Sequence, residues 1–157
     1  MSPAWLNPAE RAKFLAFMED RFGIPPTAFD GHALFRKGEF INAVSRSAME
    51  AVVELKVEDA GIQLGRVTHS GSFKPVSRGM QVFGNLAAKN VVLITREDLK
   101  ALIQGRKVDA PEMKGFVLLR CAGAVVGVGL AREGKLESQL PRNMTEHLAL
   151  SAGNDLV

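Results

Sequence analysis

The 157-residue sequence contains no tyrosine, one tryptophan and one cysteine. A lone cysteine forms neither an internal disulfide nor a zinc site, so Cys121, which follows Leu119 in an apolar run, is expected to be a buried and inert thiol. The three histidines, His32, His69 and His147, lack the spacing of metal ligands. The sequence therefore predicts no metal and no cofactor.

Long apolar runs are also missing. Residues 1–7 show no basic region followed by an apolar stretch, and residues 116–130 are too few to cross a bilayer and include Arg120. We therefore expect neither a secretory leader nor a membrane span, and predict a cytoplasmic protein. With 46% hydrophobic and 24% charged residues, the chain has the composition of a globular protein with one sizeable core or two small ones.

Catalytic signatures are absent as well. The loop-like stretch of residues 68–75 holds His69 and two serines, but no G-x-S-x-G element accompanies them. Residues 127–129 read Gly-Val-Gly, yet a third glycine and a following helix are missing, which argues against a dinucleotide fingerprint. We therefore predict that the protein is not an enzyme. A hydrolase or transferase would need a deep pocket holding His69 or His32 near an acid.

Charge is distributed unevenly, although the net charge is only +3. Residues 60–96 contain no acidic residue, and residues 66–142 contain thirteen Lys or Arg against six Asp or Glu. If these cations share a face, they form the kind of basic surface that neutralises phosphates. The alternative, equally weighted on charge alone, is that they solvate the outer faces of strands.

The amino-terminal half has the pattern of helices beside a mainly antiparallel sheet. Asn7 and Pro8 predict a helix that ends at Gly23. Further along, the pattern predicts a hairpin around residues 37–38, a short helix from residue 48, and strands over residues 53–58 and 62–67. The expected fold of this half is α+β.

The carboxy-terminal half predicts a short helix and a meander. Thr95 and Asp98 have the spacing of a capping box for a helix that stops at Gly105. Strand-length runs follow at residues 115–121, 124–130 and 135–140. Glycines 127 and 129 inside a strand mark a bulge, a barrel corner or a close approach, and we favour a corner. We expect a closed barrel plugged by the helix.

These residues resemble a known family. Lys114 to Arg120, Gly123, residues 126–129, Gly134 to Leu136 and Leu140 to Arg142 resemble a PUA domain, and most closely the one ending RsmF-type and Sun-type RNA cytosine-5 methyltransferases. Residues 65–75 and 83–89 resemble the pre-PUA module that precedes it there and in the Nip-seven family of ribosome-assembly factors. The resemblance implies a pre-PUA-like α+β module at 1–88 and a small, mainly-β PUA-like pseudobarrel at 89–157.

The resemblance also implies an RNA-binding groove beside the barrel's helix and a late strand. Arginine offers a bidentate fork to phosphate, and a glycine at the helix end lets a phosphate backbone come close. With the cations of the acid-free span, the predicted RNA-binding residues are Lys74, Arg78, Lys89, Lys100, Gly105, Arg106, Lys107, Arg132, Lys135 and Arg142. The lack of tyrosine favours recognition of RNA shape over base stacking.

The function predicted from the sequence is non-catalytic binding of structured rRNA or tRNA in ribosome assembly or RNA modification. The alternative is a protein–protein adaptor that docks on an RNA methyltransferase or assembly factor. An adaptor would expose an apolar patch, for instance at Val125, Val126 and Val128, where an RNA binder would expose a basic groove.

Overall fold

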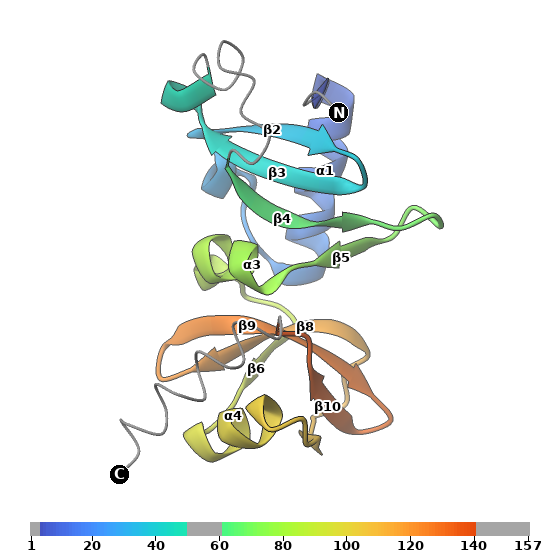
Figure 1. The fold of residues 1–157 in the computed structure, drawn as a ribbon, viewed down its shortest axis with the longest axis vertical. Coiled ribbons are helices and arrows are strands. Elements are labelled where there is room, and N and C mark those ends of the chain that lie inside the picture. The colour runs from blue at the N-terminus through green and yellow to red at the C-terminus, as the bar shows by residue number, and fades with distance from the viewer. Residues whose placement is uncertain (1–3, 50–60, 141–157) are drawn as a thin grey trace.

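The structure is a computed structural model that describes residues 4–49 and 61–140. It is a mixed α+β fold with two five-stranded sheets, one above the other along the long axis of the molecule (Figure 1). The first sheet has the order β1-β2-β3-β4-β5 and the second the order β6-β8-β9-β10-β7. No helix among the described residues is long and apolar enough to cross a membrane.

The first sheet is antiparallel throughout, as predicted. Its strands are β1 (Ala4–Trp5), β2 (His32–Lys37), β3 (Phe40–Ser45), β4 (Ile62–Val67) and β5 (Phe73–Pro75). The β2–β3 turn falls at residues 38–39, one residue later than predicted. A 3₁₀ turn (Arg46–Ala48) begins two residues before the predicted short helix, and the strand predicted at residues 53–58 lies outside the described residues.

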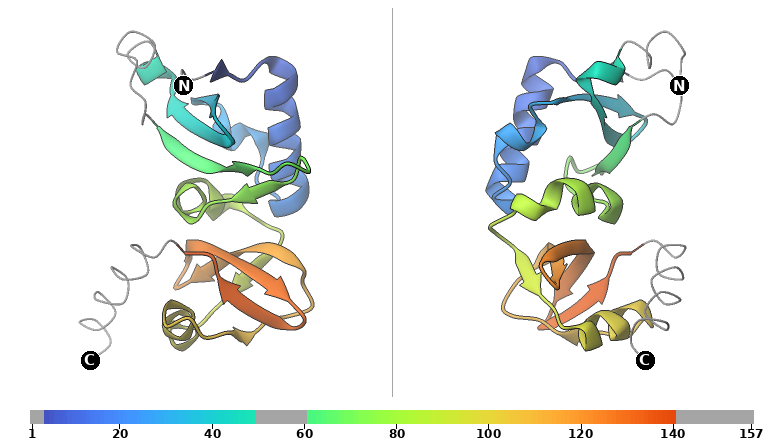
Figure 2. Two further views of the ribbon diagram at one scale, coloured as in Figure 1. Left: turned by 45° about the vertical axis from the view of Figure 1, so that its right-hand side comes forward. Right: turned by 90° about the vertical axis from the view of Figure 1, so that its left-hand side faces the viewer.

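Helix α1 (Pro8–Phe22) packs beside the first sheet (Figure 2). The Asn7 side chain accepts a hydrogen bond from the Glu10 N–H, and the Glu10 carboxylate accepts one from the Asn7 N–H, which completes a capping box. Gly23 ends the helix in the left-handed conformation, with φ 65°. Both predicted ends are confirmed. A 3₁₀ turn (Pro26–Phe29) leads from α1 into β2.

The second sheet contains the predicted meander of β8 (Gly115–Cys121), β9 (Ala124–Arg132) and β10 (Lys135–Ser138). The sequence did not predict β6 (Val91–Leu93), which runs parallel to β8, or β7 (Val108–Asp109), which pairs with β10. Helix α4 (Arg96–Ile103), with the predicted Thr95–Asp98 capping box, connects these two edge strands.

The second sheet is curled but open among the described strands, so the prediction of a closed barrel is corrected. Its order begins at β6 and ends at β7, two strands of three and two residues. Strands this short offer few backbone groups for a closing ladder. Instead, α4 crosses between them and contacts β7 and β10. The resulting shape is a half-barrel with a helix on its inner side (Figure 1).

Glycines 127 and 129 allow close approach. A Cβ at Gly127 would meet the side chain of Leu140 and lie 3.0 Å from Ser77 Oγ, and one at Gly129 would lie 2.9 Å from Leu119 and Leu136 side-chain atoms. The β8–β9 register also shifts beside Gly127, between Leu119 and Arg120. Of the three readings offered by the sequence, the contacts support close approach at both glycines, and the register shift supports a bulge or similar irregularity at Gly127.

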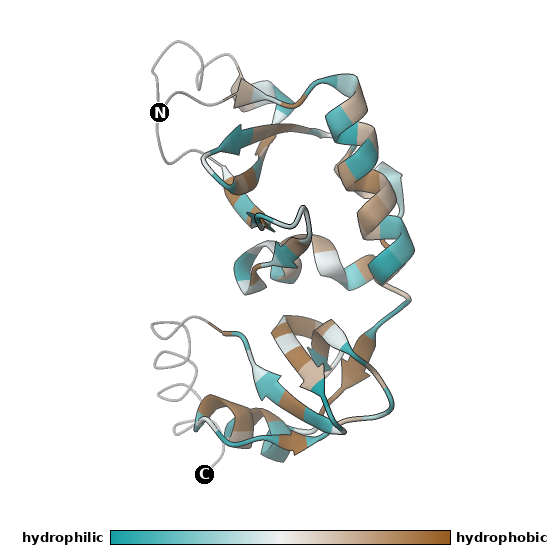
Figure 3. Cartoon of the chain, turned by 90° about the vertical axis from the view of Figure 1, so that its right-hand side faces the viewer, coloured by the Kyte–Doolittle hydropathy of each residue, from teal (hydrophilic) through white to brown (hydrophobic). Residues whose placement is uncertain are grey.

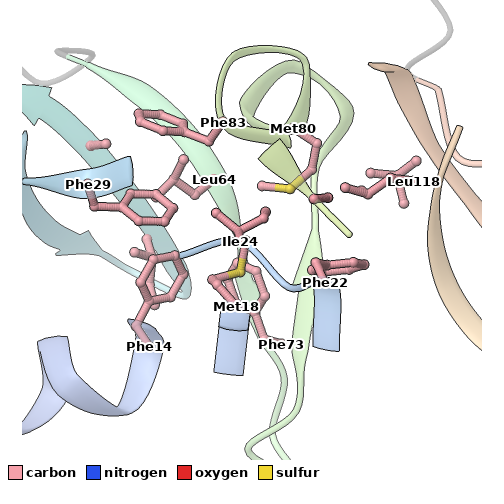
Figure 4. Close-up of a cluster of buried hydrophobic side chains, with 14 of the residues drawn as sticks. Phe14, Met18, Phe22, Ile24, Phe29, Leu64, Phe73, Met80, Phe83 and Leu118 are labelled. Carbon is pink, nitrogen blue, oxygen red and sulfur yellow. The ribbon is translucent and has the colours of Figure 1, made fainter. Parts of the chain in front are cut away.

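One hydrophobic core extends across both sheets. Helix α3 (Ser77–Phe83), followed by a 3₁₀ turn (Gly84–Leu86), lies between β4 and β9 and contacts both. Its Met80 and Phe83 belong to the same buried cluster as Phe22 of α1 and Leu118 of β8 (Figure 4). Burial of this cluster therefore couples the two halves, and the division at residues 88–89 stays a prediction.

A second core lies between α4 and the inner side of the half-barrel. Val117, Leu119 and Cys121 of β8 point into it, while Leu118 points to the first core, so β8 is buried on both faces. The buried thiol predicted for Cys121 is confirmed. Residues 116–119 of β8 are accordingly four apolar residues in succession, and Figure 3 shows hydrophobic stretches, in brown, in this sheet.

Candidate nucleic-acid interface

Three of the predicted RNA-binding residues surround one pocket at the end of the β9–β10 hairpin. Arg132 ends β9, Lys135 begins β10, and Lys107 precedes β7. The pocket, of about 220 Å³, is also lined by Leu130, Glu133 and Glu137. We call Lys107, Arg132 and Lys135 the cationic cluster.

Carboxylates of the same sheet hold each member of the cationic cluster. Glu137 accepts a hydrogen bond from Arg132 Nη2 at 2.7 Å, and its other oxygen lies 3.7 Å from Lys107 Nζ. Lys135 Nζ lies 2.5 Å from Asp109 Oδ1. The hydrogen bond and the positive charge of Lys135 keep the pKa of Asp109 below its ordinary value. The cluster is thus ordered, and part of its charge is neutralised from within the half-barrel.

Helix α4 brings further predicted residues to this end of the sheet. The helix contacts β7 and β10 and carries Lys100 at an exposed position, and Gly105 and Arg106 directly precede Lys107 in the chain. Gly105 has φ 81°, and no heavy atom lies within 4 Å of the position that a Cβ would take. Arg106 Nη2 donates to Gln104 Oε1 at 2.7 Å. The backbone at the helix end is therefore open to a close neighbour.

Strand register extends the cationic cluster toward the first sheet. Leu130 pairs with Glu137 on one side and with Phe116 on the other, so these three side chains share the outer face of the sheet. Lys74 of β5 places its ammonium group 5.8 Å from the centre of the Phe116 ring. A row that consists of Lys74, two apolar side chains and Glu137 therefore runs from β5 to the cationic cluster.

Two predicted residues show no contact with this row in the described part of the chain. Arg78 is exposed on α3, and Lys89 is exposed in the connection between α3 and β6, where its side chain lies near Gly23. Arg142 lies outside the described residues.

Sequence reasoning missed Arg21, which joins α1 to the start of β8. Its Nη2 donates to Lys114 O at 2.7 Å and to Phe116 O at 2.6 Å, and its Nε donates to Phe116 O at 3.2 Å. Burial lowers the pKa of Arg21 from its ordinary value, although arginine stays charged at neutral pH. Arg21 lies on the polar side of α1, and nothing in the neighbouring sequence indicates that its side chain contacts residues more than 90 positions later in the chain.

His69 and His32, the two histidines within the described residues, have different surroundings. The His69 side chain is fully exposed, with Nε2 3.8 Å from Glu39 Oε1. His32 packs against the Phe83 ring at 5.0 Å, and its buried Nδ1 has no hydrogen-bond partner. Within residues 4–49 and 61–140, no group of three or more His, Cys, Asp or Glu is placed to hold a metal ion.

The apolar patch suggested for an adaptor is not on the surface. Val125 and Val128 are 4% and 0% exposed because they pack into the core shared with α3, and Val126 is half-buried. Among residues 4–49 and 61–140, the exposed large apolar side chains belong to Val82, Leu86 and Leu93.

Comparison with known proteins gives one partial similarity. No family model matches the chain. The chain is 27% identical over 99 residues to "Ribosomal RNA small subunit methyltransferase F" from Psychromonas ingrahamii. The match covers 59% of this chain and 21% of that protein, so the chain spans about a fifth of the relative's length. The RsmF part of the resemblance seen in the sequence is supported, and the pre-PUA and PUA assignments stay predictions.

Proposed function

We propose that this protein binds structured ribosomal or transfer RNA without catalysing a reaction. The observation that carries the proposal is the cationic cluster of Lys107, Arg132 and Lys135 around one pocket of the half-barrel. Lys74 of β5 adds a further cation beside Phe116, at the start of the row that leads to this cluster. Phosphates are the ligands that such a group of exposed cations fits best. The partial similarity to an rRNA methyltransferase points to the same class of partner.

The carboxylates within the cluster do not prevent phosphate binding. Exposed ion pairs contribute only about 0–1 kcal/mol each, so an RNA phosphate can replace a carboxylate at little cost. Lys107 forms the longest ion pair of the cationic cluster, with Nζ 3.7 Å from Glu137 Oε2, and its side chain is 61% exposed. In this proposal the carboxylates hold the cations at the surface in the RNA-free protein, and RNA phosphates replace the carboxylates on binding.

The similarity to a methyltransferase also bears on the setting of the protein. We propose a cytoplasmic role in ribosome assembly or RNA modification, in which the half-barrel is a PUA-like domain that presents RNA to a partner. Recognition through phosphates and 2′-hydroxyl groups suits a protein whose outer sheet face carries Lys and Arg beside one partly buried ring, Phe116.

The test is a binding titration with fluorescently labelled rRNA helices and tRNA. We expect the double variant Arg106→Glu, Lys107→Glu to abolish binding. The matched control Arg46→Glu, Arg96→Glu changes the net charge equally at exposed positions outside the row, and it should retain most of the affinity. Equal losses in the two double variants, or no binding of structured RNA by the unmodified protein, would refute the proposal.

The exposed side chains of Leu86 and Leu93, at 62% and 76%, favour a second candidate function, docking on an RNA methyltransferase or assembly factor. Under this alternative, Leu86→Ser with Leu93→Ser abolishes association with the partner protein and leaves RNA affinity unchanged. Under the first candidate the same double variant changes neither.

A further inference from the structure

A second pocket lies between α1 and the first sheet, beside the β4–β5 loop. Its volume is about 290 Å³. The apolar lining residues are Leu6, Phe14, Phe17, Ile41, Val67 and Phe73. The polar lining residues are Glu10, Lys13 and Arg36, and Gly71 of the loop completes the wall. The pocket is therefore an apolar hollow with charged groups at its rim.

Strand register explains why a cation reaches this hollow. Leu34 of β2 is buried in the core beside α1, and Arg36, two residues later, points to the same face of the sheet. Arg36 pairs with Ile41, which lines the pocket. The guanidinium group thus stands at the end of an apolar row, where the first turns of α1 leave the sheet uncovered.

The charges at the rim favour an anion. Glu10 already takes part in the capping box, because its Oε1 accepts a hydrogen bond from the Asn7 N–H at an N–O distance of 3.0 Å. Lys13 and Arg36 are both exposed, and no ion pair involves either side chain among the described residues. Two cations therefore face solvent beside an apolar hollow that has only one acid at its rim.

The apolar wall consists largely of aromatic rings. The Phe73 ring lies 5.4 Å from the rings of Phe14 and Phe17, in edge-to-face arrangements. Phe17 is only half-buried. Flat aromatic ligands bind well against such rings, through face and edge contacts.

We propose that this pocket binds a nucleotide, with the base against the phenylalanine rings and the phosphate between Lys13 and Arg36. A volume of about 290 Å³, close to the lower limit for ligand pockets, is large enough for a base. The nucleotide is either an unpaired residue of the bound RNA or a free mononucleotide, and the RNA source rests on the proposed function.

The first experiment uses free mononucleotides and needs no RNA. AMP and UMP are titrated into the 157-residue protein while backbone amide signals are followed by NMR. We expect saturable shifts at Gly71 and Phe73, and at least fivefold weaker binding by the double variant Lys13→Gln, Arg36→Gln. The control double variant Arg46→Gln, Arg96→Gln loses the same charge outside the pocket and should bind as the unmodified protein does.

Two probes separate the parts of the ligand. Ribose 5-phosphate lacks the base, and octanoate is an apolar anion without an aromatic ring. The inference requires both to bind more weakly than AMP. It is overturned if ribose 5-phosphate binds as well as AMP, if octanoate displaces AMP from the pocket, or if AMP shifts no amide signal there.

The second experiment identifies the source of the nucleotide. An RNA hairpin with one bulged nucleotide is compared with its fully paired counterpart. Preferential binding of the bulged RNA, lost in Lys13→Gln, Arg36→Gln, assigns the pocket to an unpaired residue of RNA. Equal binding of the two hairpins, with AMP still saturating the pocket, assigns it to a free mononucleotide. If no RNA binds but AMP does, the proposed function fails and the pocket stands.

Discussion

Replacement of Arg21 by methionine tests whether the two sheets form one folding unit. The change keeps the aliphatic stem of Arg21 but removes the donors to Lys114 O and Phe116 O. A hydrogen bond from a charged donor contributes about 1.5–3 kcal/mol. The Lys114 carbonyl is exposed and regains water, whereas the Phe116 carbonyl is partly buried. We therefore expect a loss of about 2 kcal/mol in the free energy of unfolding.

For a chain of this size, that loss lowers the melting temperature by about 4–8 °C. The assay is urea unfolding followed by two probes, far-UV circular dichroism for both sheets and the fluorescence of Trp5 for the first sheet. Because Leu118 and Val128 of the second sheet share a core with Phe22 and Met80, the two transitions should coincide in the unmodified protein and in the variant.

Arg11→Met is the matched control. Arg11 also donates to two backbone carbonyls, those of Phe29 and His32 at 2.9 Å each, but these acceptors lie just before β2 and at its start, so neither belongs to the second sheet. A similar loss of stability is expected, again with one transition. Separate transitions for Trp5 and circular dichroism in the unmodified protein, or a cost below about 0.5 kcal/mol for Arg21→Met, would refute this reasoning.

Three further predictions concern contacts within and between the sheets. Gly79→Ala should destabilise the protein by about 1–3 kcal/mol, since its Cβ would lie 2.5 Å from Gln63 O and 2.8 Å from Leu64 Cα; Gly31→Ala, which meets nothing within 4 Å, should cost far less in the same urea titration. Ser77→Ala should cost about 1–3 kcal/mol because it removes the acceptor of the buried Val128 N–H, and hydrogen exchange should show faster exchange of that amide. The pKa of Asp109, followed by carbon NMR of its carboxyl group, should lie below the ordinary 3.8 and return to it in Lys135→Ala; because the folded pKa is the lower one, the ion pair stabilises the fold above about pH 4 and is lost as the pH falls through the folded value.

Local signals explain which elements could be predicted. The capping boxes of Asn7 with Glu10 and Thr95 with Asp98 each lie within four residues, and they fix the starts of α1 and α4. The strands at 115–121 and 124–132 are separated by a two-residue turn, which sequence pattern also identifies. Such features need no knowledge of the rest of the fold.

Long-range packing explains the misses. Helix α3 begins at Ser77, and Val76 before it provides no side-chain cap. The helix also contains Gly79, so its local signal is poor, and it forms because Met80 and Phe83 are buried between the two sheets. The parallel pairing of β6 with β8 joins strands separated by helix α4. The open edge of the half-barrel follows from the shortness of β6 and β7, which the sequence does not mark.

The candidate site also has a part that the local sequence predicts and a part that depends on long-range packing. The predicted residues Lys107, Arg132 and Lys135 come together because they flank one hairpin and one neighbouring strand. The carboxylate partners Glu137 and Asp109 follow from strand register, which the sequence alone does not specify. The approach of Lys74 to Phe116 depends on how the two sheets are stacked.

The salt dependence of RNA binding in Glu137→Gln tests the central claim most directly. This change frees Arg132 and Lys107 from their shared carboxylate. We expect roughly three- to tenfold tighter binding of structured RNA at low salt, and a steeper fall of affinity with salt, by up to about one unit in the logarithmic slope. Glu112→Gln removes the same charge from an exposed position that does not line the pocket, and should change both quantities less. Weaker binding by Glu137→Gln, or RNA binding that does not respond to salt, would contradict the account.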